Sequence, residues 1–70
     1  MKYLVVFEKG DDSVGAYVPD LPGCVAVGDS VDEAEELIRG AIELHLRGMR
    51  EDRLEIPEPS AFKEVEVPAR

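Results

Sequence analysis

Three kinds of residue in this 70-residue chain could carry out chemistry: one histidine, one cysteine and sixteen carboxylates. A two-metal nuclease needs carboxylates that project from the middle of a strand. The first apolar run, Tyr3–Phe7, contains none, and Glu8 lies only at its end. Asp29 and Asp32 are explained by the start of a helix, where a carboxylate favours the dipole. We therefore expect no catalytic residue, no metal and no other cofactor.

His45 and Cys24 have no chemical partners at the required spacing. His45 falls near the middle of the apolar arc of a predicted helix, whereas Glu43 and Arg47 fall on the other side. A catalytic or metal-binding histidine needs such partners within reach, so we interpret His45 as buried, hydrogen-bonded and structural. Cys24 has no base placed near it by the sequence, and we expect a small buried side chain.

Charge and length restrict the class of protein. The chain has 16 acidic and 8 basic residues, a net charge of −8, which opposes binding to phosphate backbones and favours a basic protein partner or simply solubility. A chain this short buries only about 60% of its unfolded surface, so oligomerisation or partner binding is the expected route to further burial. No apolar run is long enough for a signal peptide or membrane span, and Cys24 is unpaired, so we expect a cytoplasmic protein.

Turn residues divide the first part of the chain into three strands. Lys2–Glu8 is apolar on both faces, as in a central strand. Pro22 and Gly23 predict a type II turn, because proline fixes the first φ and glycine accepts a positive second φ. The three runs predict an antiparallel meander of strands at Lys2–Glu8, Val14–Val18 and Cys24–Val27.

A helix follows from about Val31 to about Arg50, and Ser30-Val31-Asp32-Glu33 fits the capping box that starts helices. Its apolar positions sweep about 200° of the surface, whereas packing on one sheet needs a stripe only a little over 100° wide. Either the sheet and the C-terminal segment cover this arc together, or part of it contacts another subunit or a partner.

The C-terminal segment predicts a fourth strand at Phe62–Val67. Val65 and Val67 alternate with Glu64 and Glu66, which is typical of an edge strand with one charged face. The chain thus predicts one α+β domain over residues 1–70, in the order β-β-β-α-β, with a right-handed crossover if the last strand lies parallel to its neighbour.

Two surfaces are candidates for self-association into a homodimer or higher homo-oligomer. One is the edge strand at Val65–Val67, and the other is the helix face with Leu37, Leu44 and Met49. Asp20 and Leu21 lie in the Pro-Gly loop, where we expect them to be exposed and available to a partner, unless the turn only sets strand register. Asp20, Leu21, Glu64 and Glu66 are therefore the candidate partner-binding residues.

An ordered set of motifs resembles the HicB-like antitoxin family across roughly residues 3–60. The motifs are Val18–Cys24, Gly28-Asp29-Ser30 with Glu33-Ala34, Ala41–Leu46, and Ile56–Pro59. The resemblance implies a partly degraded ribonuclease H fold without catalysis. It also implies that the protein binds a small basic HicA-type toxin, an RNA-cleaving protein, and covers its active site.

The sequence departs from many such antitoxins because it reaches Arg70 without a C-terminal DNA-binding domain, so we expect no direct contact with nucleic acid. Two other functions stay open. One is a metal-dependent nuclease of degraded ribonuclease H type, and the other is a regulatory ligand- or protein-binding domain with no toxin partner.

Overall fold

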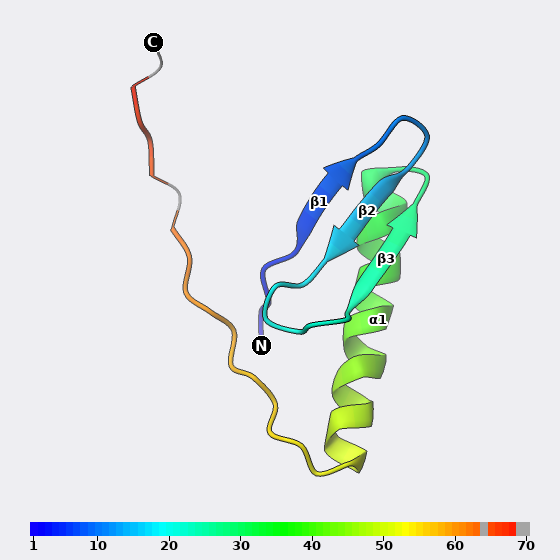
Figure 1. The fold of residues 1–70 in the computed structure, drawn as a ribbon, viewed down its shortest axis with the longest axis vertical. Coiled ribbons are helices and arrows are strands. Elements are labelled where there is room, and N and C mark those ends of the chain that lie inside the picture. The colour runs from blue at the N-terminus through cyan, green and yellow to red at the C-terminus, as the bar shows by residue number, and fades with distance from the viewer. Residues whose placement is uncertain (64, 69–70) are drawn as a thin grey trace.

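Figure 1 shows a three-stranded sheet with one long helix across one face. The structure is a computed structural model, and it describes residues 1–63 and 65–68. The elements are β1 (Val6–Lys9), β2 (Val14–Tyr17), β3 (Val25–Gly28) and α1 (Val31–Glu51). The sheet is antiparallel in the order β1-β2-β3. The predicted α+β meander followed by a helix is therefore confirmed.

β1 differs from its prediction in length and position. We expected a central strand from Lys2 to Glu8, but β1 begins at Val6 and lies at the edge of the described sheet. The apolar residues before it are half-buried for a different reason. Tyr3 and Val5 pack against the core beneath α1. Tyr3 and Val5 are therefore partly buried by packing against the core and not by a second neighbouring strand.

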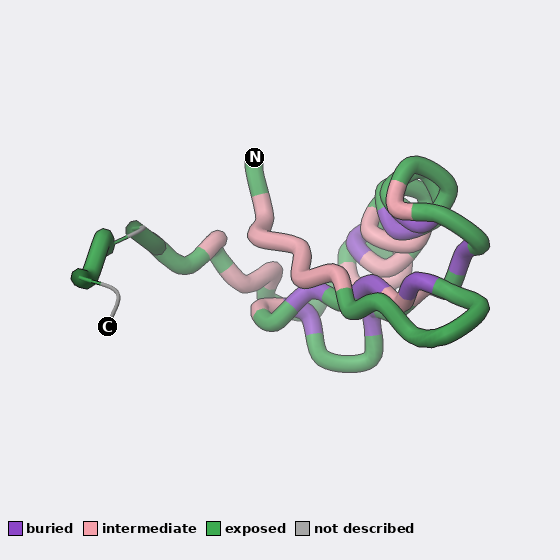
Figure 2. The backbone as a smooth tube through the Cα atoms, turned by 90° about the horizontal axis from the view of Figure 1, so that it is seen from above, coloured by how far each residue is buried: buried purple, intermediate pink, exposed green. Residues whose placement is uncertain are grey.

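The fourth strand predicted at Phe62–Val67 is not formed by the described residues of this stretch, and Glu64 lies outside them. After α1 the chain turns back and runs extended along the β1 side of the sheet, away from the body (Figures 1 and 2). Pro57 and Pro59 hold the preceding linker extended and have no N–H for a ladder. The segment is therefore exposed, with no strand beside it in this single chain.

The core lies between the inner face of the sheet and α1. Because side chains alternate along a strand, β2 turns Val14 and Ala16 toward the helix and Tyr17 toward the outer face. Ala34 and Ile38 of α1 meet them from the other side. Figure 2 shows these buried positions facing one another across the two layers. Among the residues that the structure describes, the buried apolar ones are Val14, Ala16, Val18, Leu21, Cys24, Ala34, Ile38 and Leu46.

Local hydrogen bonds fix both ends of α1. At the start, the Glu33 N–H donates to Ser30 Oγ at 3.1 Å, which confirms the N-cap half of the predicted capping box. Glu33 Oε1 accepts a hydrogen bond from the Asp29 N–H at 2.7 Å, one residue before the N–H of Ser30 that the motif uses. At the end, Arg53 takes a positive φ of 55°, and the Leu54 N–H donates back to the Met49 carbonyl at 2.8 Å. This Schellman-type end turns the chain back toward the sheet.

The sheet and the helix approach each other closely at Gly28. A Cβ placed on Gly28 would lie 2.7 Å from the Ala34 backbone nitrogen, and Ala34 itself is fully buried. A backbone atom inside the first turn of a capped helix cannot move aside as a flexible side chain can. Gly28 is thus required by the distance between β3 and α1.

We expect Gly28→Ala to lower the free energy of unfolding by about 3 kcal/mol, because the added methyl group forces β3 and α1 apart. Gly15→Ala is the matched control, since its new Cβ would come no closer than 3.9 Å to Glu8 O. We expect that control to change stability by less than about 1 kcal/mol. Urea denaturation of both variants measures the difference, and equal midpoints would contradict this account of Gly28.

Candidate partner-binding surface

The Pro-Gly loop has the predicted turn, but its side chains are placed differently from the prediction. The Cys24 N–H donates to the Leu21 carbonyl at 3.0 Å, and Gly23 takes a φ of 86°, as a type II turn requires. The expectation that Leu21 is exposed is wrong, because its side chain is only 1% exposed and lies in the core. The turn directs Leu21 inward beneath the sheet, so it is not available to a partner in this conformation.

Asp20 lies in the same loop and holds the C-terminal segment. Its Oδ2 accepts a hydrogen bond from the Ser60 N–H at 2.7 Å, and its Oδ1 accepts one from Ser60 Oγ at 2.5 Å. These bonds, the side-chain one first, hold the pKa of the Asp20 carboxyl below its ordinary value of 3.8. The Asp20 carboxylate therefore already binds another part of this chain, and its partner Ser60 lies forty residues further along the sequence.

A second contact holds the same linker. The Tyr3 hydroxyl donates to the Pro57 carbonyl, and Ile56 packs against the core. The linker is therefore fixed to the body at both ends, whereas Phe62, Val65 and Val67 beyond it are exposed. Glu66 is exposed as well, and Glu64 lies outside the described residues. The contacts thus present an extended apolar and acidic segment, which we call the tail (residues 61–68).

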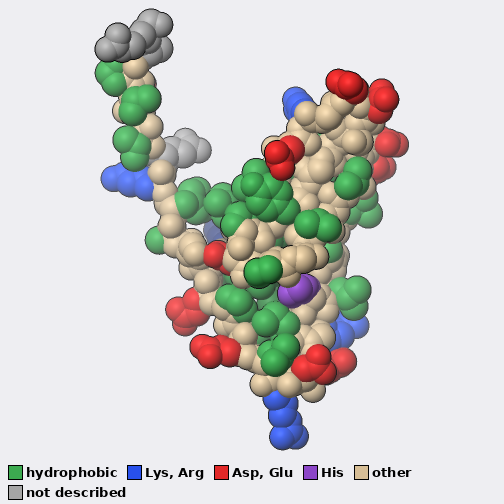
Figure 3. Space-filling model, viewed as in Figure 1, with side chains coloured by type: hydrophobic (Ala, Val, Ile, Leu, Met, Phe, Trp, Pro, Cys, Tyr) green, Lys and Arg blue, Asp and Glu red, His purple; other side chains and the backbone are tan. Residues whose placement is uncertain are grey.

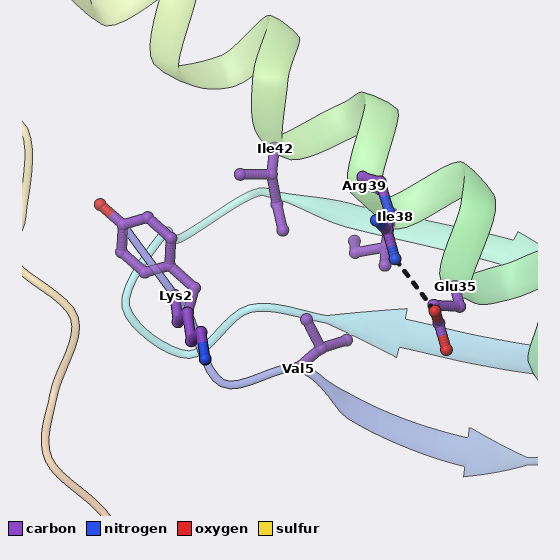
Figure 4. Close-up of a pocket in the computed structure, with 7 residues that line it drawn as sticks. Lys2, Val5, Glu35, Ile38, Arg39 and Ile42 are labelled. Atoms are coloured by element: carbon purple, nitrogen blue, oxygen red, sulfur yellow. Dashed lines mark hydrogen bonds and ion pairs between the residues drawn. The ribbon is translucent and has the colours of Figure 1, made fainter.

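An open groove lies between the first residues of the chain and α1. Figure 4 shows Val5, Ile38 and Ile42 directed into it, with Lys2 at one end. Its volume is about 380 Å³, and the Glu35–Arg39 ion pair, at 3.0 Å, lies beside it. Phe62 of the tail lines the adjoining hollow next to β1. This groove accepts apolar side chains, and its exposed ion pair adds little energy of its own.

The residues considered for chemistry form no reactive set. Cys24 is buried as predicted, and burial raises the pKa of its thiol, which makes it a weak nucleophile. His45 is half-buried, and its ring has no hydrogen bond to another described residue, so that part of its prediction is not supported. Within residues 1–63 and 65–68, no three His, Cys, Asp or Glu side chains come together as a metal site.

The sequence reasoning missed an apolar surface on the outer face of the sheet. Val25, Val27 and Tyr17 are exposed there, and Figure 3 shows hydrophobic side chains grouped over this face, with most acidic groups toward its periphery. The signal was present, because Val25 and Val27 alternate with the inward-facing Cys24 and Ala26. The interpretation of this run as a strand left open what covers the face of the sheet that carries Val25 and Val27.

The structure also shows which residues of the apolar helix arc are covered. Met49 packs against the core, whereas Leu37 and Leu44 are exposed. The helix therefore has more apolar surface than its own sheet covers. Among the described residues, no helix is both long enough and apolar enough to cross a membrane.

These features define a small two-layer α+β domain, and comparison with known proteins identifies its family. Residues 3–68 match the family described as HicB_like antitoxin of bacterial toxin-antitoxin system. The protein named Antitoxin HicB 2 from Photorhabdus laumondii is 38% identical over 71 residues, which cover 99% of this chain and 51% of that protein.

Two further relatives extend the comparison. An uncharacterized 14.9 kDa protein of Haemophilus phage HP1 is 38% identical over 64 residues, covering 91% of this chain and 48% of that protein. A UPF0150 protein from Helicobacter pylori is 45% identical over 49 residues, covering 70% and 68%. The chain thus spans about half the length of the phage and Photorhabdus proteins. It belongs to the HicB-like antitoxin family.

We expect the tail to detach when Asp20 is protonated. Because the folded-state pKa is lowered, the contact with Ser60 is fully present above the ordinary value of 3.8 and is lost as the pH falls through the lowered pKa. The amide chemical shift of Ser60, followed by NMR during acidification, measures this. Asp20→Asn should displace the Ser60 signal already at neutral pH, whereas Asp12→Asn, in the distant hairpin, should not. A Ser60 amide that stays unchanged through the titration would contradict the anchor.

Proposed function

We propose that the chain neutralises a small basic RNA-cleaving toxin of the HicA type by covering its active site, without catalysis of its own. The observation that carries this proposal is the family match over residues 3–68, which includes every described element. We place the protein in the cytoplasm, where such a toxin meets RNA. Residues 1–70 act in this proposal as one domain.

The acidic surface is the first support for this partner. A net charge of −8 attracts a basic protein over a distance comparable with the Debye length, and this attraction raises the association rate more than the final affinity. The same charge imitates that of the RNA which the toxin cleaves. Binding therefore competes with RNA whether or not a side chain touches the catalytic group.

The tail is the proposed contact surface. It offers exposed apolar side chains at Phe62, Val65 and Val67, and these supply the central energy of an interface. Glu64 and Glu66 supply charge around them. Asp20 acts one step away, because its bonds to Ser60 fix where the tail leaves the body. Leu21 has no place in this interface because it is buried.

An extended segment in which apolar and charged side chains alternate can also pair with the edge of a sheet, when a partner supplies that edge or exposes it. We propose that the tail becomes the fourth strand in the complex and completes the degraded ribonuclease H-like fold. The linker prolines keep it extended beforehand, which reduces the entropy lost on binding. A homo-oligomer is part of the same proposal.

Charge reversal on the tail tests this interface. We expect Glu64→Lys with Glu66→Lys to slow association with a small basic toxin of the HicA type several-fold and to change dissociation less. Glu36→Lys with Glu43→Lys, on the polar face of α1, changes net charge equally and serves as the control. Stopped-flow measurement of the association rate at several salt concentrations separates the effect of charges on the tail from the effect of the net charge. Equal slowing by both pairs would remove the tail from the interface.

An apolar change tests the energy of the contact, and RNA cleavage tests the function. Phe62→Ala should speed dissociation roughly tenfold or more, as loss of a buried aromatic anchor does. The unmodified chain at equimolar concentration should stop RNA cleavage by the toxin. Continued cleavage, or the absence of a neighbouring gene for a small basic protein, would reject toxin neutralisation. RNA cleavage by the chain alone with Mg²⁺ would favour a nuclease instead.

A further inference from the structure

The register of the sheet determines which side chains share its outer face. The buried residues of β2 face the helix, so Gly15 and Tyr17 lie on the outer side. Residues directly opposite one another on neighbouring strands share a face, and Gly15 pairs with Glu8 of β1 and with Val27 of β3. The outer face therefore carries a row with a carboxylate at one end, an aliphatic side chain at the other and no side chain between them.

The fold of the single chain gives no reason for a glycine at position 15. Glycine weakens a strand interior. A Cβ on Gly15 would come no closer than 3.9 Å to Glu8 O, so there is room for a larger residue, in contrast to Gly28. The backbone conformation does not need glycine either, because the described glycine with a positive φ is Gly23. A glycine in a strand is typical of a place where another molecule approaches closely.

The side chains around Gly15 are open to a partner and differ in chemistry. Glu8 is exposed and forms no ion pair with another described residue. Tyr17, two residues further along β2, is 38% exposed, and Val27 is 65% exposed. Figure 1 shows no second layer over this face of the described sheet. A negative charge, an aromatic ring and an aliphatic surface thus surround one position that lacks a side chain.

We propose that these four residues, Glu8, Gly15, Tyr17 and Val27, receive an arginine side chain of the basic protein partner. The guanidinium pairs with the Glu8 carboxylate through two parallel hydrogen bonds and lies against the Tyr17 ring. One guanidinium can make both contacts, because diagonal positions on neighbouring strands are within reach of long side chains. Its aliphatic stem passes over Gly15 beside Val27. We call this set the Gly15 site.

Arginine fits the Gly15 site better than the other side chains of a partner. A planar guanidinium can stack on a ring and pair with a carboxylate at once, whereas a lysine ammonium is a strongly hydrated point charge. An apolar side chain over Gly15 would cover Glu8 without a partner for its charge, which is costly. The carboxylate also repels phosphate groups. The chemistry of Glu8 and Tyr17 together therefore selects arginine.

This inference rests on the proposed function for the basic character of the partner and adds a contact outside the tail. Figure 1 shows the tail on the β1 side of the sheet, and β1 is the strand that carries Glu8. One partner can therefore contact the tail and the Gly15 site together. The tail charges act on the association rate, whereas a paired arginine acts on the dissociation rate.

Two variants test the Gly15 site with a small basic RNA-cleaving toxin of the HicA type. We expect Glu8→Gln and Gly15→Val each to weaken binding roughly tenfold, mainly through faster dissociation. Glu51→Gln, an exposed residue at the end of α1, removes the same charge and should change binding much less. Far-UV circular dichroism verifies that each variant folds. Variants that bind as the control does, or a Glu8→Gln chain that binds more tightly, would overturn the Gly15 site but leave toxin neutralisation standing.

A titration without toxin separates this inference from the proposed function. The probes are the tripeptides acetyl-Gly-Arg-Gly-amide and acetyl-Gly-Lys-Gly-amide at millimolar concentration, followed by NMR of the chain's amides. We expect the arginine peptide to shift the Tyr17 and Val27 signals more than the lysine peptide does, and Gly15→Val to remove the response. Equal shifts with both peptides, or none at these amides, would overturn the site whether or not a toxin binds. Sedimentation that differs between the unmodified chain and Glu8→Gln would place a second copy there instead and would also overturn it.

Discussion

The structure depends on one close contact, the packing of β3 against the first turn of α1. Gly28 allows it, because any larger residue would meet the Ala34 backbone, and the capping box at Ser30 starts the helix immediately after the strand. This short connection lays a 21-residue helix across a sheet whose strands have four residues each. The helix packs on β2 and β3, an open groove remains between it and the residues before β1, and the outer face of the described sheet has no second layer over it.

A two-layer domain of this size cannot bury all its apolar side chains. Eight of the described residues form the buried core, and most of the exposed large apolar side chains lie at two places, the β3 side of the domain and the tail. The two places differ in chemistry. Val25 and Val27 of the β3 edge are apolar and exposed, whereas the tail combines apolar and acidic residues and leaves the body next to the contacts of Asp20 and Tyr3.

Local signals in the sequence were enough to predict much of the fold. Ser30 and Glu33, Pro22 and Gly23, and the alternation in β2 act through neighbouring backbone atoms, and each predicted its element correctly. The errors came from contacts between distant parts of the chain. Leu21 is buried by a layer that alternation does not reveal. The tail forms no strand with the described chain because extended geometry is local, whereas a strand also needs a neighbour.

The candidate site was less predictable for the same reason. The sequence indicated that Asp20 was special, but its partner Ser60 is forty residues away and belongs to no recognisable motif with it. Which of the apolar arc residues are exposed depends on where α1 crosses the sheet, so Leu37 and Met49 could not be separated in advance. Family resemblance supplied the kind of partner, which the residue pattern alone left open.

Native mass spectrometry of the chain mixed with a small basic RNA-cleaving toxin of the HicA type tests the central claim most directly, because it reports whether the two proteins associate and in what ratio. The account predicts one dominant assembly that contains two copies of this chain and a toxin bound to each. A chain that appears only without toxin, under conditions where the toxin is folded and cleaves RNA, would contradict it.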